Sequence, residues 1–114
     1  MNFFSWLTGH FSNRGRALFL CKRGMRKARN HDHEGAIDDY STAIDMPNAS
    51  PDLMAMAQYN RALVHLATKN DPQAIEDLNL ILAMKETLTN VKTMARQVLI
   101  RIEGRSTTSR RQKH

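Results

Sequence analysis

The sequence predicts an all-α fold, a helix-hairpin solenoid of about two repeats plus a C-terminal capping helix. Three observations predict it. Apolar residues recur at helical spacing, the pattern returns 38 positions later, and helix-start and helix-breaking residues separate the segments. With 114 residues the chain has room for one domain. We divide it into an apolar N-terminal segment at 1–13, a helical domain at 14–104 and a flexible basic tail at 105–114.

The N-terminal segment concentrates large apolar side chains in a short stretch. They are Phe3, Phe4, Trp6, Leu7 and Phe11. The run is shorter than the roughly 20 apolar residues needed to cross a bilayer, and it lacks the charged start and cleavage site of a secretory signal. We therefore expect a cytoplasmic protein. The segment could fold back over the first hairpin, insert shallowly into a membrane interface, or bind a partner.

Two helices in the middle of the chain show the same apolar face. The first face consists of Ala36, Ile37, Tyr40, Ala43 and Ile44, and adding 38 gives Ala74, Ile75, Leu78, Ile81 and Leu82. Asp32 is placed to cap the first helix, and Asp71 before Pro72 to cap the second. The match without a gap predicts a repeated unit.

Each of these helices should follow another helix, so that two hairpins form. The same offset pairs Ala17 with Ala55, Leu18 with Met56, Gly24 with Ala62, Met25 with Leu63, and Ala28 with Leu66. A glycine in mid-helix costs up to about 1 kcal/mol, so Gly24 indicates a closely packed neighbour. Between the hairpins, Pro47 to Pro51 breaks the helix, and Ser50 should cap the next one.

A final helix is expected from Thr89 to Glu103. Its apolar face holds Val91, Met94, Ala95, Val98, Leu99 and Ile102, and Gly104 should end it. It resembles the first helix of a third repeat whose second helix is missing, so we interpret it as a cap of the array or as a surface that a partner covers.

These segments resemble the tetratricopeptide repeat, a helix-turn-helix unit of 34 residues with a small residue midway along its first helix. The stretch from Gly24 to Ile44 and the stretch from Asn60 to Leu78 carry the likeness. Large aromatic residues of the family are absent at Leu20, Gln58 and Leu78. The offset exceeds 34 by four residues, which we assign to the connection around Pro47.

The resemblance implies a function, because tetratricopeptide proteins bind segments of other proteins in a concave groove lined by the first helix of each hairpin. The implied groove residues on the first two such helices are Leu18, Cys21, Lys22, Met25, Arg29, Met56, Tyr59, Asn60, Leu63 and Leu66. The mixture is apolar with a basic edge. The resemblance therefore implies a protein-binding scaffold or adaptor that takes an acidic peptide.

On the last helix, Lys92 and Arg96 share one face, and two alignments both turn them toward the groove. One alignment uses Ala95 as the small mid-helix residue. The other resembles the carboxylate clamp with which some family members hold acidic chaperone tails, with Asn60, Lys92 and Arg96 matching. Cys21 and Met25 depart from that clamp, so an acidic peptide in general is the better expectation.

Charge is strongly segregated along the chain. Residues 1–30 hold seven Lys and Arg and no acid, residues 31–80 hold nine acids and two bases, and residues 81–114 hold eight bases and two acids. Basic blocks can also neutralise phosphates, so a nucleic-acid-binding accessory protein is an alternative. Self-association through opposite blocks is another.

Catalysis and metal binding have little support in the sequence. Cys21 is the only cysteine, which excludes an internal disulfide, and a free cysteine usually packs as a small hydrophobe. His31 and His33 flank Asp32 in an expected turn without a further close ligand. We expect a non-enzymatic protein without a cofactor or metal.

Overall fold

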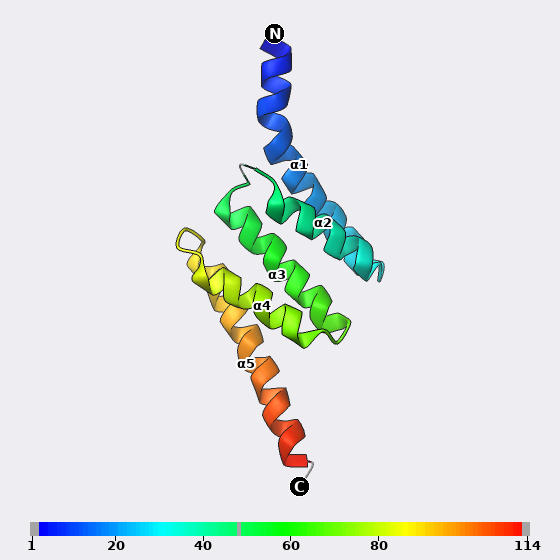
Figure 1. Ribbon diagram of the computed structural model, residues 1–114, viewed down its shortest axis with the longest axis vertical. Coiled ribbons are helices and arrows are strands. Elements are labelled where there is room, and N and C mark those ends of the chain that lie inside the picture. The colour runs from blue at the N-terminus through cyan, green and yellow to red at the C-terminus, as the bar shows by residue number, and fades with distance from the viewer. Residues whose placement is uncertain (1–2, 48, 113–114) are drawn as a thin grey trace.

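The computed structural model describes the backbone of residues 3–47 and 49–112 and the side chains of residues 15–47 and 49–108. Five helices and no strand are present in this part of the chain (Figure 1). They are α1 (Phe3–Arg29), α2 (His33–Asp45), α3 (Pro51–Ala67), α4 (Asp71–Ala83) and α5 (Thr89–Gln112). The predicted all-α hairpin fold is confirmed. None of the helices in the described ranges is long and apolar enough to cross a membrane.

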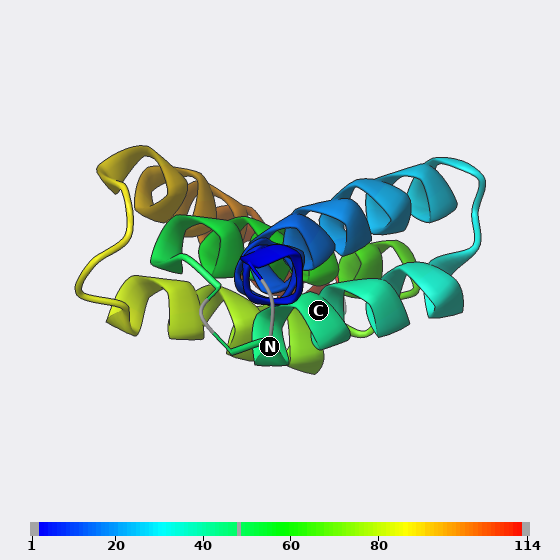
Figure 2. The ribbon, with the colours of Figure 1, turned by 90° about the horizontal axis from the view of Figure 1, so that it is seen from above.

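The helices form two layers in an elongated molecule, 70 Å along its longest axis. Seen from above, α1, α3 and α5 lie in one layer, and α2 and α4 lie in the other (Figure 2). Each of α2 and α4 therefore packs under the helix before it and the helix after it in the chain. We call the first layer the inner layer and the second the outer layer.

The two hairpin turns have the same backbone geometry, 38 residues apart. His31 and Lys69 both take a positive φ, 63° and 61°, which is uncommon for residues with a side chain. The amide of Asp32 donates to the carbonyl of Lys27 at 2.8 Å, and the amide of Asn70 donates to that of His65 at 2.7 Å. Such bonds satisfy carbonyls at a helix C-terminus. The sequence offset is therefore also an offset of the structure.

Two of the three predicted helix caps are confirmed. Asp32 accepts from the amide of Gly35 at 3.0 Å, and Ser50 accepts from the amide of Leu53 at 3.2 Å. The prediction for Asp71 is wrong, because the turn bond fixes Asn70 as the boundary residue and Asp71 falls inside the first turn of α4. Its carboxylate still lies at the positive end of the helix dipole.

Small residues let the two layers approach closely. A Cβ atom built on Gly24 would lie 2.7 Å from Cε1 of Tyr40, which is closer than real side chains pack. Tyr40 itself is fully buried between Gly24 and the next repeat. The predicted close packing at Gly24 is confirmed. Ala62, which takes the equivalent position in α3, is also fully buried.

Both ends of the chain depart from the prediction. Residues 3–13 continue α1 without a break and project beyond α2 instead of folding back over the first hairpin, and the side chains of this segment lie outside the described residues (Figure 1). The predicted stop at Gly104 is wrong, since α5 continues to Gln112. A glycine ends a helix when it takes a positive φ, and no described glycine does so. The hydroxyls of Thr107 and Thr108 donate to the carbonyls of Glu103 and Gly104.

Candidate functional site

The inner layer exposes a repeated set of apolar side chains. Leu18 and Met25 on α1 pair, at the 38-residue offset, with Met56 and Leu63 on α3, and between 37% and 46% of each residue is exposed. We call these four residues the apolar row. Burying large apolar side chains is favourable, so a repeated exposed set on one layer indicates a contact surface.

A cleft of about 260 Å³ opens between α1 and α3. We call it the central cleft. Met25 and Leu63 of the apolar row lie on its walls, Asn60 and Arg29 supply polar groups, and Tyr40 from α2 closes its floor. Its lining residues are Met25, Ala28, Arg29, His33, Tyr40, Asn60, Leu63, Val64 and Ala67.

A second cleft, of about 370 Å³, lies between α3 and α5, and we call it the distal cleft. Its lining residues are Leu63, Leu66, Val98, Arg101, Ile102 and Arg105. Each is 38 positions after a lining residue of the central cleft, namely Met25, Ala28, Asn60, Leu63, Val64 and Ala67. The two clefts are therefore the same structural feature in successive repeats. The distal one carries two arginines where the central one has Leu63 and Ala67.

A third cleft, of about 390 Å³, lies along the free edge of α1, and we call it the edge cleft. Its lining residues are Phe19, Lys22, Met25, Arg26 and Arg29. The last four precede lining residues of the central cleft by 38 positions. At the edge cleft the basic side chains of α1 replace the amide and apolar groups of α3.

The position of α5 corrects the prediction for Lys92 and Arg96. In the 38-residue alignment Ile100 takes the place of Ala62, so both predicted alignments of this helix are wrong. Nine residues are two and a half helical turns, which places Lys92 on the opposite side of α5 from Arg101. Arg101 and Arg105 line the distal cleft in their place.

The chaperone-tail clamp is not assembled for the same reason. Asn60 lines the central cleft, but Lys92 and Arg96 lie on the side of α5 that a sixth helix would cover. Ile100, on that side, is 67% exposed, whereas Ala62 is fully buried under α4. The sequence missed this because the connection before α5 sets the alignment, and its length is not fixed by the apolar pattern.

Cys21 is not a groove residue. Only 5% of it is exposed, and it packs with Leu20, Ala43 and Ala57 in the core of the first hairpin. Burial raises the pKa of its thiol. The packed role was one of the two roles expected for this cysteine, and the groove role is corrected.

The structure distributes the other predicted residues over the inner layer. Leu18 and Met56 belong to the apolar row, and Tyr59 is half-buried against the core that α3 shares with α4 and α5. The predicted residues that line a described cleft are Lys22, Met25, Arg29, Asn60, Leu63 and Leu66.

The charge blocks of the sequence become charge layers in the structure. Helices α2 and α4 carry seven acids, four and three respectively, and no Lys or Arg. Helix α1 carries seven Lys and Arg and no acid, and α5 carries six against one. The inner layer is therefore basic and the outer layer acidic, a separation that attracts acidic ligands to the clefts.

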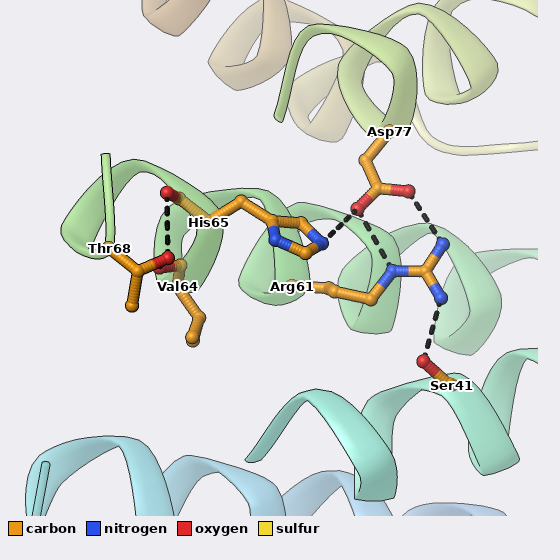
Figure 3. Close-up of polar contacts among 6 residues, drawn as sticks. All are labelled: Ser41, Arg61, Val64, His65, Thr68 and Asp77. Atoms are coloured by element: carbon orange, nitrogen blue, oxygen red, sulfur yellow. Dashed lines mark hydrogen bonds and ion pairs between the residues drawn. The ribbon is translucent and has the colours of Figure 1, made fainter. Parts of the chain in front are cut away.

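Two repeated ion pairs join the layers. Arg23 donates from Nε and Nη2 to the carboxylate of Asp39 at 2.8 Å each, and Arg61 binds Asp77 in the same way at 2.9 and 2.6 Å (Figure 3). The pKa of Asp39 is lowered by the hydrogen bond from Arg23. Sequence reasoning missed these pairs, although the 38-residue offset relates Arg23 to Arg61 and Asp39 to Asp77.

A third group completes each pair. Lys27 lies 3.2 Å from Asp39, and His65 takes its place beside Asp77, with Nε2 at 3.8 Å (Figure 3). Burial lowers the pKa of His65. Nη1 of Arg61 also donates to Ser41 of α2 at 2.9 Å, so this arginine links the two hairpins. These groups fix the helices that shape the clefts, and they do not line them.

Among the described residues no group of three or more His, Cys, Asp or Glu side chains is placed to hold a metal ion. Comparison of the chain with protein-family models, curated protein sequences and solved structures yields no match. The function must therefore be argued from the clefts themselves.

Proposed function

We propose that the chain is a non-catalytic binding module of tetratricopeptide-like architecture, which holds an acidic segment of another protein on its inner layer. The observation that carries the proposal is the recurrence of one cleft in successive repeats, flanked by the apolar row, on the basic layer of the molecule. A surface that repeats along the solenoid fits a ligand that is itself extended or helical.

Charge and apolar contact have separate roles in this proposal. Met25 and Leu63 provide contact area at the centre, because buried apolar surface contributes about 25 cal/mol per Å². Arg101 and Arg105 at one end of the face, and Lys22 and Arg29 at the other, are placed to bind carboxylates. The preferred ligand has apolar side chains in the middle and acidic groups toward both ends.

The tetratricopeptide likeness is supported by position as well as by sequence. Gly24 and Ala62 are the small residues where the helices of each hairpin cross, and Ala36 and Ala74 are fully buried opposite them. We also propose a cytoplasmic location, which the free thiol of the buried Cys21 supports.

The proposal is tested by selecting peptides from a phage-displayed random library on the intact chain and measuring their affinity by fluorescence polarisation. We expect acidic peptides with apolar centres. The double variant Arg101→Glu with Arg105→Glu should weaken binding at least about tenfold, or 1.4 kcal/mol. Lys92→Glu with Arg96→Glu makes the same change in net charge on the other side of α5 and should have little effect.

Two results would count against an acidic protein ligand. Equal losses in the two double variants would show that only net charge matters. Tight binding of a single-stranded oligonucleotide with a steep salt dependence, lost in Arg101→Glu with Arg105→Glu, would instead establish the nucleic-acid reading of the basic layer.

A further inference from the structure

The first helix exposes a seam that the other inner helices bury. On α3, Ala57 and Val64 pack against the preceding hairpin, and on α5 the equivalent Ala95 and Ile102 are buried in the same way. The equivalent residues of α1 are Phe19 and Arg26, and both are exposed, Phe19 to 52%. We call Phe19, Lys22, Arg23 and Arg26 the open seam.

The open seam also repeats the hydrogen-bonding group that joins one hairpin to the next. Arg61 uses Nε and Nη2 for Asp77 and donates from Nη1 to Ser41 of the preceding outer helix. Arg23 uses the same two nitrogens for Asp39, and no hydrogen bond of its Nη1 is found within the described residues. Instead its guanidinium lies 5.4 Å from the centre of the Phe19 ring. The seam therefore has the geometry of a surface that an outer-layer helix covers.

The chemistry of the seam differs from that of its buried equivalents and favours one kind of occupant. Where α3 and α5 have Val64 and Ile102, α1 has Arg26, and residues 1–30 contain no acid. The outer layer has the opposite character. Its exposed acids are Glu34, Asp38, Asp45 and Glu76, and Leu80, one turn after Glu76, is 45% exposed. A basic seam around an exposed phenylalanine thus complements an acidic face around an exposed leucine.

We propose that the open seam of one copy binds the outer layer of a second copy, with Phe19 packed near Leu80 and the cations of α1 facing the acids of α2 and α4. This surface is separate from the central and distal clefts. The contact joins two different surfaces, so copies associate head to tail. Because most of its groups are exposed charges, the association is weak and salt-sensitive.

Sedimentation velocity of the intact chain tests the proposal. The wild-type chain should show an average mass that rises with protein concentration at low salt, and this rise should be lost at about 1 M salt, where the Debye length is about 3 Å. Phe19→Asp removes the seam and Leu80→Asp removes the outer face, so each variant alone should stay monomeric. An equimolar mixture of the two retains one good contact and should form a 1:1 heterodimer.

Matched variants separate this surface from others. Leu88→Asp changes another exposed leucine, outside both surfaces, and Leu63→Asp changes the peptide-binding clefts. Both should associate like the wild type, and far-ultraviolet circular dichroism should show that every variant remains helical. A wild-type chain that is monomeric at all concentrations, a Phe19→Asp variant that still associates, or a mixture without heterodimer would each overturn the proposal.

Discussion

Arg23 and Asp39 join α1 to α2 through two parallel hydrogen bonds of 2.8 Å, and the same pair recurs 38 residues later as Arg61 and Asp77. The two copies differ in exposure, because 41% of the Arg23 side chain is accessible and only 20% of the Arg61 side chain. One interaction type therefore sits in two environments within one molecule.

The more buried pair should matter more for stability. Removing the charge of Asp77 leaves Arg61 half-buried without its partner, and breaking a buried pair in this way costs about 3 kcal/mol. We expect Asp77→Asn to lower the free energy of unfolding by about that amount, as measured by urea denaturation, and Asp39→Asn to lower it less. Glu76→Gln, at an exposed neighbour, should change it by less than about 0.5 kcal/mol. Equal losses at Asp39 and Asp77 would contradict the argument from exposure.

Two glycines in helices should respond to alanine in opposite ways. At Gly24 the new methyl group meets the ring of Tyr40 at 2.7 Å, and overpacking of this kind costs about 1–3 kcal/mol. At Gly104 nothing lies within 4 Å, so alanine should gain up to about 1 kcal/mol of helix propensity. Thermal unfolding of Gly24→Ala and Gly104→Ala should shift the Tm down and up respectively. A stabilised Gly24→Ala variant would show that Tyr40 moves freely.

His65 should make the fold less stable in mild acid. Burial holds its pKa in the folded state below the value near 6.5 of the unfolded chain. As the pH falls through that value, the unfolded chain takes up a proton first, so stability drops until the folded pKa is reached. His65→Gln should show a smaller loss between about pH 7.5 and pH 5.5 than the wild type. His31→Asn, at an exposed turn residue, is the matched control and should follow the wild-type profile.

The thiol of Cys21 should be protected in the folded protein. Its burial and raised pKa both lower the amount of accessible thiolate, which is the reactive form. We expect slow reaction with a disulfide reagent at pH 8 and fast reaction in denaturant, followed by absorbance. Fast reaction of the native chain would show that the first hairpin opens readily.

The sequence alone determined the helices, the 38-residue repeat and most of the helix starts, because these depend on neighbours along the chain. Apolar spacing identifies a buried face, and Asp32 and Ser50 cap their helices through the third residue that follows. The row formed by Leu18, Met25, Met56 and Leu63 was accessible for the same reason.

Only the tertiary structure decided how α5 sits against the second hairpin, and hence that Arg101 and Arg105, and not Lys92 and Arg96, line the distal cleft. A helix shows the same apolar pattern whichever way its neighbours turn it, so its rotation depends on the packing of Val91, Ala95 and Val98 on the core. Packing also brought Arg23 to Asp39 across sixteen residues and sorted the charge blocks into layers. Contacts between helices carry that information, and no single segment contains it.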